Sequence, residues 1–183
     1  MWVIIQAGAW KSEEILDEFQ LDWQVYTCLA YGARAIILAS YSKGWWDKTT
    51  SCVNPEGKKN KTYEYTQKIF SVLHSPLGTE FLKYKYMGTR VYGGIDSSDE
   101  RIRPQLKKQN ETEKQDFPGI KINSDKAVVV GYFEKENDHA VMIVNSHNPF
   151  DSSAAADVKI ESSKKPVTEI TIKSGQGMFM LLS

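Results

Sequence analysis

The sequence predicts a fold of class α/β plus β, in which two β/α units precede an antiparallel β-sandwich. Two observations predict it. Near the N-terminus, short apolar runs at residues 2–7 and 34–41 flank one amphipathic stretch, which is typical of parallel strands joined by a helix. Toward the C-terminus, short β-branched and aromatic runs alternate with turn residues, which is typical of a sandwich of antiparallel strands. With 183 residues, the chain has room for one or two domains.

The first unit is expected to begin with a buried strand. Residues 2–7 form a continuous apolar run that is too short for a helix, as in strands covered on both faces. A helix is then expected from Ser12, with two acidic residues in its first turn, to Gly32, a residue type that commonly ends helices. Residues 34–41 repeat the apolar pattern and are expected to pair in parallel with the first strand.

The second unit follows a long loop, which is expected at residues 42–61. A second helix is expected to begin near Thr62. Pro76 should end or kink that helix, because proline disfavours helical geometry in the residue before it. A short helix at 79–82 and a strand at 84–92 are expected to complete the segment.

Composition divides the chain into three segments. Between residues 96 and 126 charged and small polar residues dominate, and the few large apolar residues do not offset the entropy of ordering the chain. We therefore expect a β/α segment at 1–94, a charged linker at 95–125 and a C-terminal β-sandwich domain at 126–183. The five strands expected in the sandwich are residues 127–133, 139–145, 156–160, 167–172 and 177–182.

Charge and composition argue against several classes of function. Lys plus Arg and Asp plus Glu are 23 each, and a chain without net charge is a poor match for nucleic acid or an anionic membrane. No apolar run approaches the roughly 20 residues of a membrane-spanning helix, and the first residues lack a signal-peptide pattern, so we expect a cytoplasmic protein. Cys28, Cys52 and the three histidines lie too far apart in the sequence to indicate a metal site. No motif indicates a cofactor. The spacing of the two cysteines does not support a disulfide between them.

Polar and aromatic residues cluster after both expected strands. The carboxyl ends of parallel strands are where α/β folds place their chemistry. A tryptophan pair beside Tyr, Asp and Lys suits a sugar, because flat aromatic faces stack on its C–H surface while polar groups bind its hydroxyls. Alternatively, Trp45 and Trp46 only pack as core at this end of the fold. The substrate-binding candidates are Gln6, Trp10, Tyr41, Trp45, Trp46 and Asp47.

The same residues carry a resemblance to a known family. The segment Trp2-Val-Ile-Ile-Gln-Ala-Gly-Ala-Trp10, the helix ending Leu29-Ala-Tyr-Gly-Ala-Arg34 and the run Ala35-Ile-Ile-Leu-Ala-Ser-Tyr41 resemble the last two β/α units of a β-galactosidase-like glycoside hydrolase. Residues 61–77 resemble the helix that closes such barrels, and residues 128–182 resemble the C-terminal β-domain. The resemblance implies a partial (β/α)₈ barrel remnant of two units, followed by a β-sandwich, in a protein associated with carbohydrate.

The departures from that family bear on catalysis. Retaining glycosidases need two carboxylates about 5 Å apart, and in this family the nucleophile is a Glu at the end of the seventh strand. The matching position here is Gln6, an amide, and the fourth strand, which supplies the acid/base, has no counterpart. We therefore assign no catalytic residue, and expect a glycoside-hydrolase-related protein or fragment that does not catalyse alone.

Two alternatives stay open at this point. The chain could be a non-catalytic carbohydrate-binding or assembly module, or an inert fragment of a split gene. Either way, a short sheet with apolar faces leaves unpaired edges, which proteins cover or pair. We therefore expect self-association or a complementing chain that supplies strands.

Overall fold

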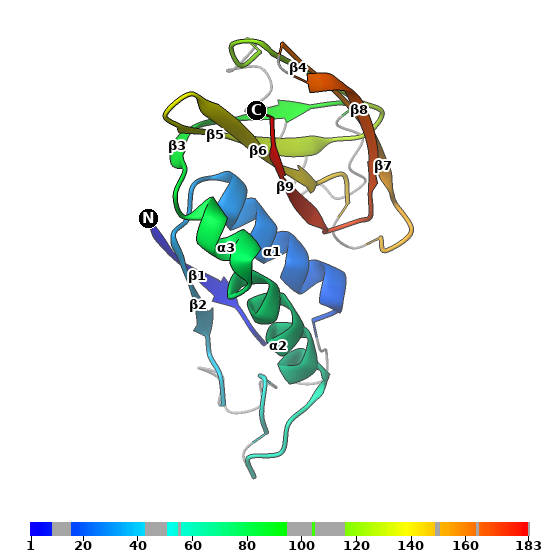
Figure 1. The fold of residues 1–183 in the computed structure, drawn as a ribbon. Helices are drawn as coiled ribbons and strands as arrows, with labels where there is room; N and C mark the ends of the chain where they lie inside the picture. Colours follow the sequence, from blue (N-terminus) through cyan, green and yellow to red (C-terminus); the bar gives the residue numbers. More distant parts are fainter. Residues whose placement is uncertain are drawn as a thin grey trace.

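The computed structural model places three α-helices and nine β-strands along the described part of the chain (Figure 1). The described residues are 1–8, 16–42, 51–54, 56–94, 104, 116–148, 151–163 and 165–182. The elements are β1 (Trp2–Gln6), α1 (Glu18–Ala30), β2 (Ala35–Ala39), α2 (Lys61–Leu73), α3 (Pro76–Phe81), β3 (Lys85–Tyr92), β4 (Ile120–Ser124), β5 (Val128–Lys135), β6 (Asp138–Asn145), β7 (Ala156–Ser162), β8 (Lys165–Ile172) and β9 (Gly177–Leu181).

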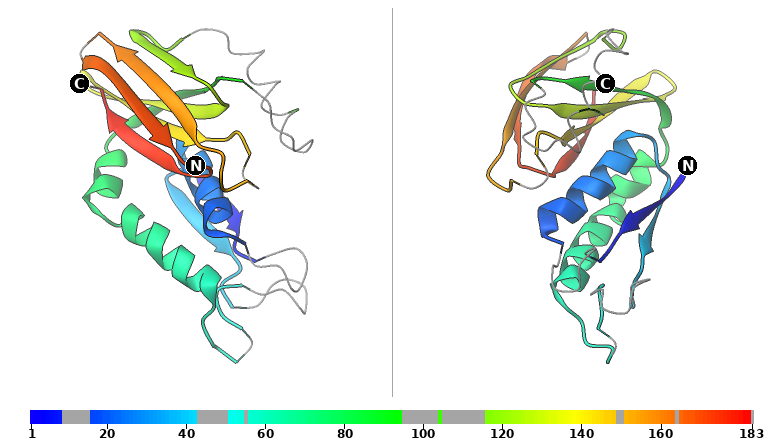
Figure 2. Two further views of the ribbon diagram at one scale, coloured as in Figure 1. Left: turned by 90° about the vertical axis from the view of Figure 1, so that its right-hand side faces the viewer. Right: turned by 180° about the vertical axis from the view of Figure 1, so that it is seen from behind.

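The strands form three sheets. β1 and β2 pair in parallel as a sheet of two strands, β3-β5-β6-β9 form an antiparallel sheet of four, and β4-β7-β8 form an antiparallel sheet of three. The helices and the β1–β2 sheet make up one half of the molecule, and the two larger sheets make up the other (Figure 2).

Two hydrophobic cores follow from strands that are buried on both faces. Alternate side chains of a strand point to opposite faces of its sheet. In β5, Val129 and Phe133 therefore lie in a core shared with the helices, whereas Val128 and Val130 lie in a second core between the two larger sheets. The fold is built around β5 and its neighbour β6, and the helices cover one face of their sheet.

Local signals explain where the helices end. Gly32 follows α1 with a φ of +79°, the left-handed conformation that glycine adopts readily after a helix. α2 ends at Leu73, and Pro76 begins α3 after the side chain of Ser75 caps it by accepting a hydrogen bond from the main-chain N–H of Leu77 at 3.2 Å. α1 begins after Asp17, whose main-chain N–H donates to Gln20 Oε1 at 3.1 Å, and the expected helix start, Ser12, lies outside the described residues.

The predicted fold class is wrong. Strands outnumber helices three to one among the described elements, and the chain is largely β. β1 and β2 do pair in parallel, with α1 between them in the chain. After α2 and α3, however, β3 pairs antiparallel with β5 and does not extend a barrel. The strand–helix–strand pattern is a local signal, and it does not report that the next strand joins another sheet.

A second expectation fails at the same sheet. Residues 2–7 were expected to be covered on both faces, yet only one face of β1 is covered by described residues: Ile5 is buried, whereas Trp2 and Ile4 are exposed.

β4 lies within the stretch expected to be a charged linker, with Ile120 and Ile122 buried in the second core. Within the described ranges, no helix has the length and apolar content needed to cross a membrane.

Candidate functional site

Two of the predicted site residues lie at the C-terminal ends of the two strands of the β1–β2 sheet. Gln6 is the last residue of β1 and pairs with Ala39, the last residue of β2, so both strands end together. Tyr41 follows two residues later and is half exposed. The remaining candidates, Trp10, Trp45, Trp46 and Asp47, lie outside the described residues.

The main chain of Gln6 is held by helix α1. Its N–H donates to Gln24 Oε1 at 3.0 Å, and Gln24 Nε2 donates to its carbonyl oxygen at 3.2 Å. The next residue, Ala7, donates to the carbonyl oxygen of Ala39 at 3.1 Å, so the main-chain groups of Gln6 point away from β2. The Gln24 amide therefore bonds the outer edge of β1 as a neighbouring strand would, and covers that edge at this residue.

The chemistry of Gln6 is limited by its side chain. Its Nε2 donates to the carbonyl oxygen of Gly8, which turns part of the amide back onto its own loop. An amide carries neither the negative charge of a nucleophilic carboxylate nor a proton to transfer at neutral pH. Gln6 can therefore bind and orient a polar ligand, but it cannot supply covalent or acid–base catalysis.

An aromatic pair lies beside the end of β2. The ring of Tyr41 meets that of Tyr63 edge to face, with centroids 6.4 Å apart. The Lys59 ammonium lies 4.1 Å from the centroid of the Tyr63 ring, and its hydrogen bond to Tyr63 raises the pKa of Lys59. Tyr63 is held here because its main-chain N–H donates to Asn60 Oδ1 at the start of α2. Lys59 of the expected loop and Tyr63 of α2 thus add an aromatic and cationic surface beside Tyr41 that the sequence pattern does not indicate.

Burial disfavours the thiolate of both cysteines. Cys52 is buried, its Sγ lies 3.5 Å from Thr66 Oγ1, and burial raises the pKa of its thiol. Burial likewise raises the pKa of Cys28. Since the thiolate is the reactive form, neither is poised as a nucleophile. Among the described residues, no three His, Cys, Asp or Glu side chains are grouped so that they could hold a metal ion.

One acidic residue has a strongly perturbed pKa, and it lies between helices rather than at the strand ends. Burial raises the pKa of Asp22 to about 6; Glu18 adds to the rise and Lys68 opposes it. Lys68 Nζ is hydrogen-bonded to Glu18, which links α2 to α1. This charged cluster joins α1 to α2.

Large apolar side chains are exposed on the outer face of the β1–β2 sheet. Trp2 is 77% exposed, Ile4 62% and Ile37 42%. They lie on one face, because Ile4 pairs with Ile37 and Trp2 is two residues from Ile4. On the other face Val3, Ile5, Ile36 and Leu38 pack into the core with the helices. We call Trp2, Ile4 and Ile37 the open face.

No protein-family model matches this chain, and comparison with curated proteins and with solved structures finds no match either.

Proposed function

We propose that this chain is a non-catalytic, glycoside-hydrolase-related assembly module. It associates with a second copy of itself through the open face, and the C-terminal strand ends of the same sheet contact carbohydrate. The open face is the observation that carries the proposal. Exposed apolar residues are ordinary when scattered, but adjacent ones on a sheet whose outer edges have no strand partner among the described residues mark an interaction surface.

The free energy available from burying the open face is of the same order as the cost of association. Burying a whole isoleucine side chain contributes about 1.5–3 kcal/mol, and the exposed fractions of Ile4 and Ile37 together amount to about one such side chain. A symmetric contact doubles this, and Trp2 adds a larger area than either. Association costs about 4–15 kcal/mol of lost freedom, so the expected dimer is concentration-dependent rather than permanent.

A charge on the open face tests the proposal. Ile4→Lys places an ammonium group where the second copy would pack, and we expect size-exclusion chromatography with light scattering to give a dimer for the native chain and a monomer for the variant. Val167→Lys is the matched control. Val167 is also exposed on a strand, and that strand, β8, belongs to a different sheet from the open face. A native chain that stays monomeric at high concentration contradicts self-association and leaves a complementing chain as the partner.

Carbohydrate contact is supported by a separate observation: β1 ends at Gln6, and Tyr41 follows two residues after Ala39, the residue of β2 that pairs with Gln6. Tyr41 offers an exposed ring beside Tyr63, and the Gln6 amide offers hydrogen bonds. Calorimetric titration with galactosides, glucosides and xylosides should show saturable binding that Tyr41→Ala removes and Leu82→Ala, a change at an exposed residue after α3, does not. Release of sugar in the same samples would contradict the non-catalytic assignment.

A further inference from the structure

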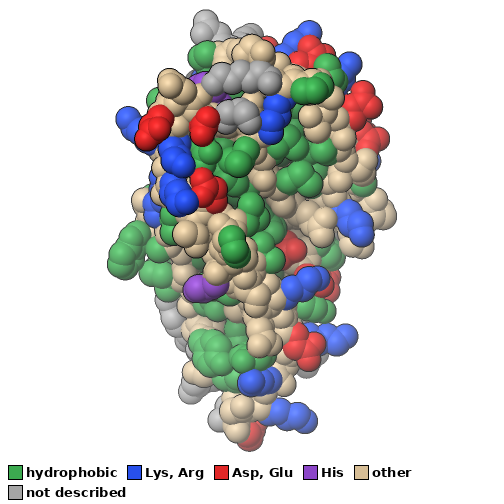
Figure 3. All heavy atoms as spheres, in the orientation of Figure 1, with side chains coloured by type: hydrophobic (Ala, Val, Ile, Leu, Met, Phe, Trp, Pro, Cys, Tyr) green, Lys and Arg blue, Asp and Glu red, His purple; other side chains and the backbone are tan. Residues whose placement is uncertain are grey.

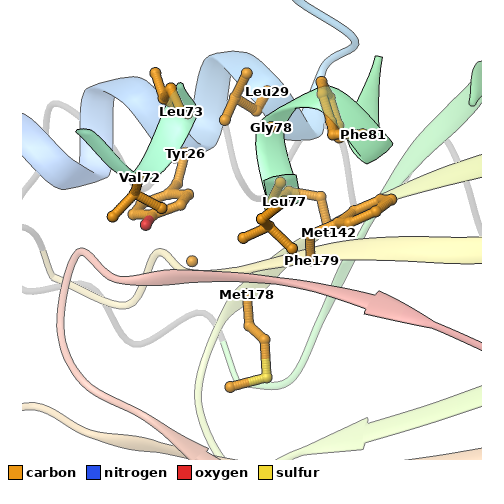
Figure 4. Close-up of a pocket in the computed structure, with 11 residues that line it drawn as sticks. Tyr26, Leu29, Val72, Leu73, Leu77, Gly78, Phe81, Met142, Met178 and Phe179 are labelled. Carbon is orange, nitrogen blue, oxygen red and sulfur yellow. The ribbon is translucent and has the colours of Figure 1, made fainter. Parts of the chain in front are cut away.

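A cavity lies away from the open face, where the helices meet the four-stranded sheet. α1, the junction of α2 and α3, and strands β6 and β9 enclose about 140 Å³ (Figure 4). Apolar side chains reach the surface along the boundary between helices and sheets (Figure 3). We propose that this cavity binds a small, uncharged aromatic or branched hydrocarbon molecule about the size of one benzene ring.

The floor of the cavity is rigid and apolar. Leu29, Phe81, Met142 and Phe179 line it and are all buried. The rings of Phe81 and Phe179 meet edge to face at 84°, with centroids 5.3 Å apart, a favourable geometry for aromatic pairs. A packed aromatic floor of this kind does not collapse into the space above it, so the volume is kept for a ligand.

The mouth is formed by apolar side chains that water still reaches. Val72 at the end of α2 is 37% exposed and Leu77 in α3 is 44% exposed. Figure 4 shows the side chains of both on the side of the cavity formed by the helices, whereas that of Met178 points away from the helices. A bound hydrocarbon would remove Val72 and Leu77 from water, which is favourable in proportion to the apolar area covered.

Part of the wall is the main chain of β9 at Gly177. A Cβ atom at Gly177 would lie 2.5 Å from Cγ of Tyr26, so the main chain of β9 packs directly against the Tyr26 side chain of α1. A glycine within a strand commonly marks such a close approach. The position therefore has to remain glycine, and it adds no group that fills the cavity.

The lining determines the chemical class of the ligand. Tyr26 is the one residue with a hydroxyl among the described lining residues, and none of these is charged. A charged ligand would lose its hydration without gaining a counter-ion, which is costly. An apolar cavity of about 150 Å³ in another protein stays dry and binds benzene, so the volume here fits a ligand of that size.

Methyl NMR of the full chain with ¹³C-labelled methionine tests the proposal, with benzene and benzoate as probes. The methyl group of Met142 lies at the floor, and Met87, exposed in β3, serves as the internal control. We expect benzene to shift the Met142 signal saturably, with no shift at Met87, and benzoate to leave both unchanged. A Met142 signal that does not shift, or that shifts in parallel with Met87 or with benzoate, overturns the proposal.

Variants at the mouth provide the second arm. Leu77→Trp should fill the opening and weaken benzene binding at least about tenfold, or about 1.4 kcal/mol. Leu82→Trp adds the same ring at an exposed residue that does not line the cavity, and should bind as the native chain does. If Leu77→Trp does not fold, Val72→Trp blocks the same mouth from α2. Unchanged binding in a folded mouth variant overturns the assignment to this cavity.

Discussion

Replacing Asp22 by Asn should stabilise the protein at neutral pH and leave it unchanged in acid. The pKa of Asp22 rises from 3.8 to about 6 in the folded chain, mainly because of burial, with a smaller rise from Glu18 and an opposing effect of Lys68. The folded state therefore holds the proton more tightly than the unfolded state. Its contribution to stability is fully present below pH 3.8 and is lost as the pH rises through about 6.

The magnitude follows from the shift. Each pKa unit corresponds to about 1.36 kcal/mol, so a rise of about two units sets an upper limit near 3 kcal/mol. Asp22 is only partly buried, and solvent screens the charge, so we expect about 1 kcal/mol. Asn has nearly the same shape and no charge to desolvate, so the variant should gain this amount at pH 7 and almost nothing at pH 4.

Urea denaturation at pH 4, 5, 6 and 7 measures the effect. The difference in free energy of unfolding between Asp22→Asn and the native chain should grow across this range. Glu169→Gln removes the same charge from an exposed position in β8 and should show no such growth. A destabilised Asp22→Asn at pH 7, or a difference that does not depend on pH, would refute the reasoning.

Three further changes test the packing and capping of the fold. Gly131→Ala should destabilise the protein by about 1–3 kcal/mol, because a Cβ there would lie 2.1 Å from the carbonyl oxygen of Ala30; an unchanged melting temperature would contradict this close approach. Phe133→Ala removes a fully buried ring from the core beneath the helices and should cost about 3–5 kcal/mol in urea denaturation; a loss below 1 kcal/mol would mean that the core is not packed as described. Asn60→Ala removes the side-chain oxygen that accepts from the main-chain N–H of Tyr63 and should cost about 1 kcal/mol in thermal denaturation, with no loss if the cap is dispensable.

Elements that depend on neighbouring residues could be predicted from the sequence. The end of α1 at Gly32, the break before Pro76 and the five C-terminal strands each follow from a pattern only a few residues long. The parallel pairing of β1 with β2 also follows, since strand, helix and strand adjoin in the chain.

Pairings between distant residues could not be predicted. β3 pairs with β5 about 40 residues later, and β6 pairs with β9, so the four-stranded sheet draws on segments that the composition separates. β4 was missed because Lys121 and Asn123 alternate with its buried isoleucines and make a half-buried strand look polar.

The candidate site divides in the same way. The strand ends indicate Gln6 and Tyr41, and the parallel register ends β1 at Gln6 and β2 at Ala39, two residues before Tyr41. The bonds from Gln24 and the ring of Tyr63 depend on how α1 and α2 pack against the sheet, which no local pattern reports. The apolar run at residues 2–7 likewise predicts burial without showing that one face would remain uncovered by described residues.

Hydrogen exchange of the native chain at increasing protein concentration tests self-association through the β1–β2 sheet most directly. We predict that the amides of residues 1–6 exchange more slowly as concentration rises, while those of β8 keep a constant rate, and that Ile4→Lys removes the concentration dependence. Exchange of residues 1–6 that is fast and independent of concentration would contradict the proposal that a second copy covers the open face.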